Sequence, residues 1–204
     1  MSDDALQSFE RLLEGRAPQE AIGKLAAYAA LVERWSRHHS LVRVAGREEL
    51  VERHLLESLA PIDRLPNAGR LADVGSGAGL PGIPLLCALS GWSGVLIEPR
   101  RKRETFLKLV IRELGLDAEV APCRFEEFEG GGFDLVTSRA LGGVEALLRW
   151  AEHRLTPPGR VAIWGTVDDL PALGGLSGWT VVSSPLPGLI RGRLILLSTE
   201  GVFR

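Results

Sequence analysis

The feature that most constrains the fold of this chain is an alternation that begins at Arg70. From there on, short runs rich in Val, Leu and Ile alternate with stretches of helical periodicity. Strands buried on both faces have such continuous apolar runs, and helices that connect them as crossovers give a parallel sheet. The pattern therefore predicts an α/β fold with a mostly parallel sheet and helices on both faces. The expected strands are 71–74, 94–97, 118–121, 133–138 and 160–164, and the expected helices are 81–89, 100–115 and 144–155.

A pair of apolar runs near the C-terminus predicts a β-hairpin. Residues 179–184 and 189–198 have strand character, and they flank the segment 185–188, which contains two prolines and a glycine. No further helix is clear after Thr166. We expect the two strands to close the fold as a C-terminal β-hairpin.

The N-terminal part has a different pattern and predicts helices. Residues 19–35 carry apolar side chains at a spacing near 3.6, and a second helix is expected to start near Arg47 and to end before Pro61. A chain of 204 residues has room for one α/β domain and a smaller part beside it. We expect an N-terminal helical extension over residues 1–65 and the α/β domain over residues 66–204.

Composition excludes several classes of protein. Hydrophobic residues make up 45% and charged residues 25%, as in globular proteins, and the formal net charge of −2 argues against a uniformly basic surface. Cys87 and Cys123 support neither a zinc framework nor a disulfide scaffold, which favours a reducing compartment. No run reaches the roughly 18 apolar residues of a membrane span. We expect a cytoplasmic protein without a metal site.

A glycine-rich segment follows the first expected strand and opens the first helix of the α/β part. Its glycines would let a ligand approach the backbone closely, and amides at a helix N-terminus can point at such a ligand. Leu80 stands where the dinucleotide fingerprint GxGxxG needs a glycine, and the Lys-Ser/Thr pair of a P-loop is missing. The segment thus predicts a cofactor site in which an acidic residue precedes xGxGxG. It reads Asp73-Val74-Gly75-Ser76-Gly77-Ala78-Gly79-Leu80-Pro81-Gly82-Ile83-Pro84.

This acidic and glycine pattern resembles the S-adenosylmethionine site of class I methyltransferases, which have a Rossmann-like fold. In those enzymes the second strand normally ends in an acidic residue that binds the ribose hydroxyls. Here Glu98 follows the second expected strand, and a carboxylate can accept both hydroxyl protons. The resemblance implies that the chain binds S-adenosylmethionine, with Asp73, Gly77 and Glu98 at the site.

Several other segments share a more specific pattern. They are 73–84 with its Gly-Leu-Pro-Gly-Ile-Pro ending, 98–103 with Phe106-Leu107 after it, 124–128, 138–140 and 54–59. Together they resemble the RsmG (GidB) family, bacterial methyltransferases that act on N7 of a guanine in 16S ribosomal RNA. The resemblance covers roughly residues 30 to 200, and it implies the same activity, with 16S ribosomal RNA or the small ribosomal subunit as the partner.

The family resemblance also implies individual cofactor contacts, at Gly75, Leu80, Phe125, Glu126 and Arg139. Phe125 and Glu126 follow the third strand, where a loop can frame an adenine ring; the alternative for Phe125 is core packing. Arg139 ends the fourth strand, at the sheet edge where ligands of open α/β folds bind. A cation there can meet a methionine carboxylate or an RNA phosphate, and the alternative is a structural salt bridge.

The residues at the end of the fourth strand indicate which class of atom is methylated. Thr137-Ser138-Arg139-Ala140 differs from the Asn/Asp-Pro-Pro-aromatic strings that hold exocyclic amines, so transfer to such amines is disfavoured. Cys87 and Cys123 are better explained as packing residues than as the nucleophile that pyrimidine carbon methylation needs. Guanine N7 has its own lone pair, so its methylation depends on alignment and needs no general base. We therefore assign no catalytic proton-transfer residue.

Basic residues offer contacts to RNA phosphates. Six basic residues and one acidic residue, Glu104, lie between positions 100 and 112. The expected RNA-binding residues are Arg100, Arg101, Lys102 and Arg103, with Arg139. The alternative is a solvated helix face. His54 lies on an apolar stripe and is expected to be a hydrogen-bonded structural histidine. A second basic group in the N-terminal part consists of Arg34, Arg37, His38, His39, Arg43, Arg47 and Arg53.

Three other functions remain open at this point. A small-molecule methyltransferase would use the same cofactor half, with the N-terminal helices as a lid over the substrate. A dinucleotide-dependent oxidoreductase is disfavoured by Leu80, and a non-catalytic ribosome-binding protein would keep the fold without turnover. For the favoured function we expect no DNA partner, no membrane partner and a monomeric protein.

Overall fold

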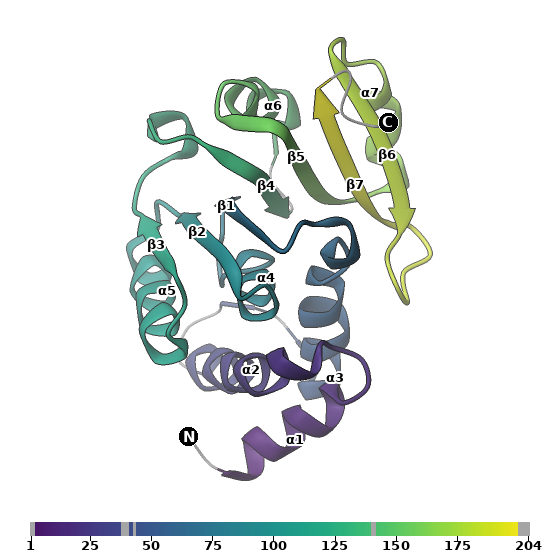
Figure 1. Cartoon of the computed structure of the whole chain (residues 1–204). Helices are drawn as coiled ribbons and strands as arrows, with labels where there is room; N and C mark the ends of the chain where they lie inside the picture. The colour runs from purple at the N-terminus through teal and green to yellow at the C-terminus, as the bar shows by residue number, and fades with distance from the viewer. Residues whose placement is uncertain (1–2, 38–40, 43, 140–141, 200–204) are drawn as a thin grey trace.

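One mixed sheet organises the molecule. The computed structural model describes residues 3–37, 41–42, 44–139 and 142–199, and within them seven strands form one sheet in the order β3-β2-β1-β4-β5-β7-β6 (Figure 1). Strands β1 to β5 pair in parallel, and β7 is antiparallel to both of its neighbours. The strands are β1 (Ala68–Val74), β2 (Gly91–Ile97), β3 (Ala118–Ala121), β4 (Phe133–Arg139), β5 (Leu155–Thr166), β6 (Trp179–Pro185) and β7 (Gly192–Thr199).

The predicted α/β class and the mostly parallel sheet are confirmed, and so is the hairpin of β6 and β7. The hairpin inserts β7 between β5 and β6, so that β7 pairs on both edges and is nearly all buried. Strand β5 begins at Leu155, earlier than predicted, because its first residues pair beside a register shift in β4 despite Pro157 and Pro158. Prolines are tolerated at the start of a strand and near such irregularities.

Helices cover both faces of the sheet, as predicted (Figure 1). Helices α4 (Gly82–Ala88) and α5 (Arg101–Leu114) pack with α2 (Ile22–Ser36) on one face, where Leu71, Leu96 and Leu135 belong to the same hydrophobic cluster. Helices α6 (Val144–Glu152) and α7 (Leu170–Gly174) belong to a second cluster, on the other face. Side chains that alternate along the strands separate these two clusters.

The N-terminal part is helical, with two departures from prediction. The helix expected over 19–35 is a 3₁₀ turn, η1 (Gln19–Ala21), followed by α2, and the helix expected from Arg47 is α3 (Arg47–Leu50) continued by a π-helical segment, η2 (Val51–Leu56). Helix α1 (Asp3–Leu13) lies within the part expected to be helical, without bounds of its own in the prediction, and α7 had no clear sequence signal. Short 3₁₀ turns complete the chain: η3 (Ile62–Arg64), η4 (Phe125–Glu127) and η5 (Val167–Asp169).

The N-terminal helices share their core with the sheet. Phe9, Leu25 and Leu55 are fully buried in the same cluster as Leu96 of β2. The Tyr28 hydroxyl of α2 donates a hydrogen bond of 2.8 Å to the Ala78 carbonyl of the glycine-rich turn. The division at residue 65 stays a prediction, and packing of this kind means that the helices help to position the glycine-rich turn after β1.

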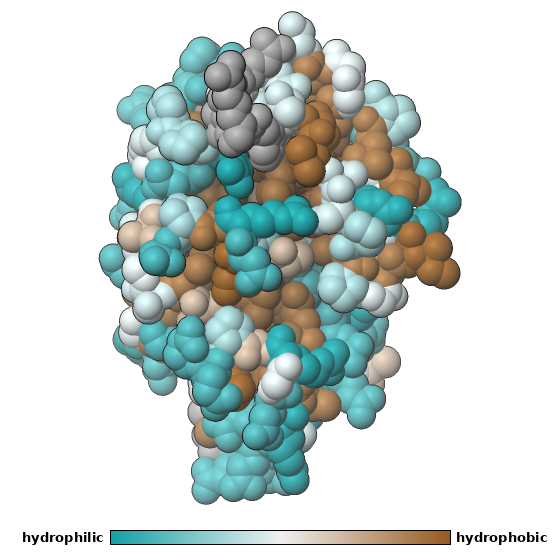
Figure 2. Space-filling view, turned by 45° about the vertical axis from the view of Figure 1, so that its right-hand side comes forward, coloured by the Kyte–Doolittle hydropathy of each residue, from teal (hydrophilic) through white to brown (hydrophobic). Residues whose placement is uncertain are grey.

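The surface agrees with this packing. Figure 2 shows a mostly hydrophilic lower end, over the N-terminal helices, and hydrophobic residues gathered in the middle and upper part of this face. Among the described residues, no helix has the length and apolar character needed to cross a membrane. The same residues contain no group of three or more His, Cys, Asp or Glu side chains that could hold a metal ion.

Candidate functional site

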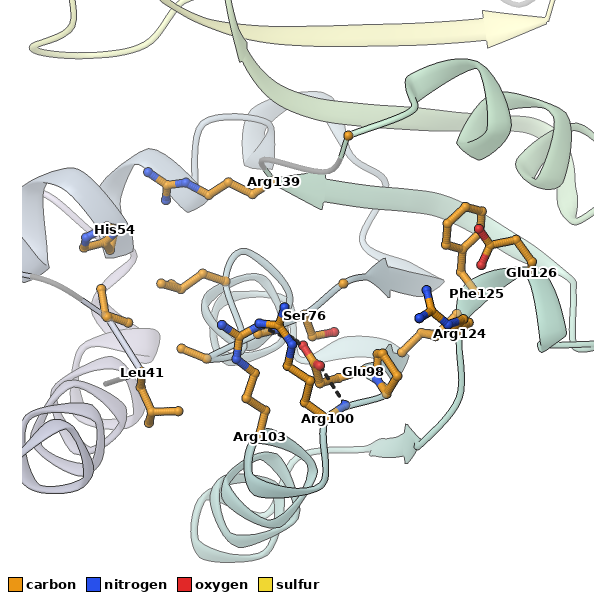
Figure 3. Close-up of a pocket in the computed structure, with 18 residues that line it drawn as sticks. Leu41, His54, Ser76, Glu98, Arg100, Arg103, Arg124, Phe125, Glu126 and Arg139 are labelled. Atoms are coloured by element: carbon orange, nitrogen blue, oxygen red, sulfur yellow. Dashed lines mark hydrogen bonds and ion pairs between the residues drawn. The ribbon is translucent and has the colours of Figure 1, made fainter. Parts of the chain in front are cut away.

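A cleft of about 640 Å³ opens at the carboxyl ends of the parallel strands (Figure 3). Strand β1 has β2 on one side and β4 on the other, so the order of connection reverses there, and ligands of open α/β sheets bind at such a point. Seven of the eight residues predicted to bind a cofactor line the cleft: Gly75, Gly77, Leu80, Glu98, Phe125, Glu126 and Arg139. The other lining residues are Leu41, Val42, His54, Ser76, Ala78, Ile97, Pro99, Arg100, Arg103, Arg124 and Gly142.

The glycine-rich turn forms the floor of this cleft and is held by its own backbone. Gly75, Gly77 and Gly79 have φ values of 72°, 60° and 99°, a region that disfavours side chains with a Cβ. The amides of Gly75 and Ser76 donate to the Ile97 carbonyl at 2.9 and 3.2 Å. The turn is thereby fixed to the end of β2 by the protein's own backbone.

The amides at the start of α4 differ from expectation. The N–H of Gly82 donates to Asp73 at 3.2 Å and the N–H of Ile83 donates to the Gly79 carbonyl at 2.7 Å. Both groups are therefore used inside the protein and do not point at a ligand. A Cβ at Gly82 would lie 2.8 Å from Asp73, so this glycine serves the close approach of helix and strand.

Asp73, the eighth predicted cofactor residue, lies behind the turn. It is fully buried, and its carboxylate accepts hydrogen bonds from Thr137 Oγ1 at 2.8 Å and from the Gly82 amide. Burial raises its pKa to about 6, although these hydrogen bonds favour the ionised form. In this position Asp73 joins β1, β4 and α4 beneath the glycine-rich turn.

Glu98 is the acidic residue expected at the end of β2, and its carboxylate faces the cleft (Figure 3). Oε2 accepts the Gly77 amide at 2.9 Å and also contacts Arg103 Nη1 at 3.4 Å. Oε1 accepts the Arg100 amide at 2.9 Å. Each carboxylate oxygen can accept about two hydrogen bonds, so Oε1 keeps one acceptor position, and a second becomes free if Arg103 moves.

Phe125 and Glu126 lie at one end of the cleft, in the short turn η4 after β3 (Figure 3). The Phe125 ring packs edge-on against Trp150 of α6, with ring centroids 5.9 Å apart. The two predicted roles of Phe125 are therefore compatible, because one side of the ring packs on the second core while the residue also lines the cleft. Glu126 is exposed.

Arg139 lies towards the opposite end and joins β4 to the N-terminal part. Its Nη2 donates to Glu57 Oε2 at 2.7 Å and to the Arg53 carbonyl at 2.8 Å. Glu57 is 1% exposed, and its other oxygen accepts from Arg53 Nε at 3.0 Å. The Glu57 carbonyl also accepts from Trp164 Nε1 at 2.7 Å. The salt bridge considered for Arg139 is present, while its buried Nη1 has no partner among the described residues.

His54 lines the same end of the cleft. It lies in the π-helical segment η2, directly after Arg53, whose carbonyl binds Arg139. Burial lowers the pKa of His54 to about 4, and the positive charge of Arg139 acts in the same direction. The hydrogen bond expected for a structural histidine is missing at Nδ1, which is buried without a partner among the described residues.

The predicted RNA-binding residues are distributed over the cleft and its rim. Arg100 and Arg103 line the cleft, and Arg103 contacts Glu98. Arg101 faces a neighbouring groove that Trp35 and Lys108 also line, and Lys102 is exposed. In the second basic group, Arg37 and Arg47 contact Glu33, Arg53 contacts Glu57, and Arg34 is exposed. His38, His39, Arg43 and Ala140 of the 138–140 string lie outside the described residues.

Several residues of the site were missed at the sequence level. Tyr28 supports the turn from α2, Glu57 holds Arg139, and Leu41 lines the cleft near His54 (Figure 3). For Glu57 the sequence held one local signal, the string 54–59, which also contains His54 and was part of the family resemblance. The other contacts join segments that are far apart in the chain.

The strand order with antiparallel β7 and the glycine-rich turn after β1 define a class I methyltransferase fold, the fold of enzymes that use S-adenosylmethionine. Solved structures agree. A ribosomal protein L11 methylase from Lactobacillus delbrueckii has a TM-score of 0.60 at 18% identity, covering 72% of this chain and 78% of its own. A precorrin-6y C5,15-methyltransferase from Geobacter metallireducens has a TM-score of 0.54 at 18% identity, covering 69% and 84%. At these identities the likeness concerns the fold alone.

Sequence comparison identifies the family. Residues 21–166 match the model of the GidB family, described as rRNA small subunit methyltransferase G. Ribosomal RNA small subunit methyltransferase G of Stenotrophomonas maltophilia (strain K279a) is 38% identical over 86% of this chain and 85% of its own length. The protein of that name from Xanthomonas euvesicatoria pv. vesicatoria is 34% identical over 98% of both chains. The chain belongs to the GidB family, as the resemblance implied.

Proposed function

We propose that this protein transfers a methyl group from S-adenosylmethionine to N7 of a guanine in 16S ribosomal RNA. The observation that carries the proposal is the convergence of Gly75, Glu98 and Arg139 in one cleft at the reversal point of the sheet. Membership of the GidB family supports ribosomal RNA of the small subunit as the substrate. A small-molecule substrate under a helical lid is not favoured, because relatives that match most of the chain share the name of an rRNA enzyme.

The residues of the cleft suit S-adenosylmethionine. Glu98 would accept the ribose hydroxyls with the acceptor position left on Oε1 and the one that Arg103 can release. Phe125 and Glu126 would frame the adenine at one end. Gly75 and Leu80 would lie along the methionine part, and the free Nη1 of Arg139 is a donor for its carboxylate or for RNA. Asp73 would act indirectly, by holding the turn.

The task of the protein in this reaction is alignment. When bound, S-adenosylmethionine would supply a methyl group on a positively charged sulfur. The N7 lone pair would form a bond to the methyl carbon in line with the C–S bond, whose electron pair leaves with the neutral sulfur, and the positive charge passes to the guanine ring. The rigid turn and the pairing of Arg139 with Glu57 keep the two sides of the cleft in place. Holding reactants in line and near contact accounts for several orders of magnitude in rate. No residue is assigned to proton transfer.

Basic side chains at the rim would hold the RNA. Arg100, Arg101 and Lys102 are exposed at the start of α5, next to the cleft. Contacts of such residues with phosphates make binding salt-dependent. The 7-methylguanosine product, a cytoplasmic location, a monomeric state and the absence of a DNA partner belong to the same proposal and stay predictions.

Transfer of a labelled methyl group tests the function. The protein and labelled S-adenosylmethionine would be incubated in three parallel reactions. The first contains small subunits from cells that lack this modification, the second contains free 16S ribosomal RNA, and the third contains no RNA. We expect label in RNA from the subunits or from the free RNA. Label in neither RNA substrate would contradict the proposal. Calorimetry with S-adenosylmethionine and NAD separates it from an oxidoreductase, which would bind NAD instead.

A further inference from the structure

We propose that His54 recognises the edge of the target guanine, at the end of the cleft where Arg139 lies. The inference rests on the proposed function and deepens it, because it assigns the residue that selects the base. His54 and Arg139 lie at one end, and Phe125 and Glu126 lie at the other (Figure 3). The base would therefore enter beside the N-terminal helices and away from the adenine of the cofactor.

Both side chains have a nitrogen without a partner. Arg139 Nη1 and His54 Nδ1 are buried and unpaired among the described residues, although each residue lines the cleft. Buried polar atoms in native proteins are nearly always hydrogen-bonded, because leaving them unpaired costs about 1–3 kcal/mol each. Two such atoms at one end of a ligand cleft indicate that a ligand supplies their partners.

The two residues are also held in place. Arg139 Nη2 is fixed by the Glu57 carboxylate and by the Arg53 carbonyl. Its other terminal nitrogen, Nη1, is left for a further hydrogen bond. His54 follows Arg53 in the same π-helical segment, and such segments are often found at functional sites. Glu57, 1% exposed, is thus a positioning residue for Arg139.

The hydrogen-bonding groups of the pair are complementary to guanine. A guanidinium only donates hydrogen bonds, whereas a neutral imidazole also offers one lone pair. With a pKa of about 4, His54 is neutral at pH 7. Guanine presents an acceptor, O6, next to a donor, N1–H, and N7 lies on the other side of O6. Arg139 Nη1 would donate to O6 and His54 Nδ1 would accept from N1–H, which leaves N7 free for methylation.

The same pattern excludes adenine and requires an unpaired base. Adenine has an amino donor in place of O6 and an acceptor at N1, so both contacts would be reversed. Because N1–H takes part in base pairing, the guanine must be presented outside a double helix. Sequence-specific proteins mostly read RNA in this unpaired state.

Three substitutions of His54 test the proposal. His54→Ala removes the ring, His54→Asn keeps a polar atom close to the position of Nδ1, and His54→Gln places one close to Nε2. Each variant and the unmodified protein would be compared in two assays. The first is the Kd for S-adenosylmethionine, by calorimetry, with thermal melting as the check on folding. The second is the single-turnover rate of methyl transfer to undermethylated small subunits at saturating cofactor.

We expect unchanged cofactor affinity in all three variants, within about twofold. We expect methyl transfer to fall about 10- to 100-fold in His54→Ala and His54→Gln, as for the loss of one hydrogen bond to a substrate group, and much less in His54→Asn. The proposal would be overturned if His54→Ala transferred methyl groups at the wild-type rate, or if the Asn and Gln variants lost the same amount of methyl-transfer rate. A loss of cofactor affinity parallel to the loss of rate would also overturn it. If the unmodified protein itself transfers no label to RNA, the proposed function fails instead.

Discussion

The two ends of the cleft differ in how far the protein satisfies its own polar groups. At the end near β2, both oxygens of Glu98 accept backbone amides, and the glycine-rich turn is hydrogen-bonded to Ile97. At the other end, Arg139 and His54 each keep a buried nitrogen without a partner among the described residues. Near β2 the backbone amides are thus paired within the protein and Glu98 Oε1 keeps one acceptor position, whereas two buried side-chain nitrogens at the other end have no partner among the described residues.

This difference agrees with the two ligands of a methyltransferase. A cofactor that is used in every turnover is best met by a rigid site, because preorganisation reduces the entropic cost of binding. A large RNA substrate instead brings its own hydrogen-bonding groups, and selectivity arises where the protein leaves polar atoms that only the correct base can pair. Substitutions at either end therefore test whether the two ends are separable.

The largest expected effect is that of Gly75→Val at the cofactor end. Gly75 has a φ of 72°, where valine is strained, and its added side chain would occupy the space of the ligand. We expect cofactor affinity to fall more than about 100-fold, or beyond about 2.7 kcal/mol, as measured by calorimetry. Gly115→Val is the matched control, since Gly115 has a φ of 58° at the end of α5 and lies outside the cleft. A similar loss of affinity in both variants would contradict the assignment of this turn.

The next largest effect is a loss of stability in Glu57→Gln, at the end of the cleft where Arg139 lies. Removing the carboxylate leaves the half-buried Arg139 and the more exposed Arg53 without an anionic partner. Breaking a buried pair is costly, and we expect the free energy of unfolding to fall by about 2–3 kcal/mol, as measured by urea denaturation. The exposed pair of Arg191 and Asp168 is the control, and Asp168→Asn should cost less than about 1 kcal/mol. Equal small effects would show that Glu57 does not anchor this end.

Glu98→Gln should weaken the binding of S-adenosylmethionine moderately. The amide keeps one acceptor oxygen, so the backbone contacts are partly retained, but the charged acceptor for the ribose is lost. We expect the Kd for S-adenosylmethionine to rise about 10- to 30-fold, equivalent to about 1.4–2 kcal/mol. Glu113→Gln, on the exposed face of α5, is the control and should leave the Kd unchanged. An unchanged Kd in Glu98→Gln would remove this residue from the proposed site.

The smallest effect is a pH dependence of stability at His54. Because its pKa is lowered to about 4 in the folded protein, the unfolded chain takes up a proton first as the pH falls below 6.5. The resulting stabilisation is complete above pH 6.5 and is lost between 6.5 and about 4. Since His54 is partly exposed, we expect a contribution of about 1 kcal/mol.

A comparison with His54→Asn isolates this contribution. Asp73, with a pKa raised to about 6, acts in the opposite direction, because its uptake of a proton in the folded state stabilises the protein as the pH falls. Arg139, Arg53 and Glu49 are the charged groups that act on His54. Urea denaturation at pH 7.5 and pH 5 should show that the free energy of unfolding falls more for the unmodified protein than for the variant. Equal losses would mean that His54 is not buried as a neutral ring.

Local sequence patterns predicted the elements that carry local signals. The apolar runs of β1 to β4 and the helices α4 and α5 lie within a few residues of their predicted bounds. The glycine-rich turn and Glu98 were also found, because strand, turn and strand follow one another closely. The beginning of β5 was missed, since Pro157 and Pro158 argue against a strand although the chain pairs there.

The remainder of the site depends on contacts that no local pattern contains. Arg139 and Glu57 are 82 positions apart, and Trp164 reaches the Glu57 carbonyl over 107 positions. These hydrogen bonds join the segment around Glu57 to β4 and β5, and they exist only in the folded chain. For the same reason, the sequence pattern of His54 indicated a structural histidine, whereas its unpaired Nδ1 becomes visible only in the folded protein.

The most direct test of the proposed function is the chemical identity of the methylated nucleoside. Small subunits lacking the modification would be treated with the protein and S-adenosylmethionine, and their 16S ribosomal RNA would be digested to nucleosides and analysed by chromatography with mass detection. We expect 7-methylguanosine as the only new product, because the proposed reaction depends on alignment of the N7 lone pair and assigns no residue to proton transfer. A methyl group on an exocyclic amine or on a pyrimidine carbon would contradict the proposed function.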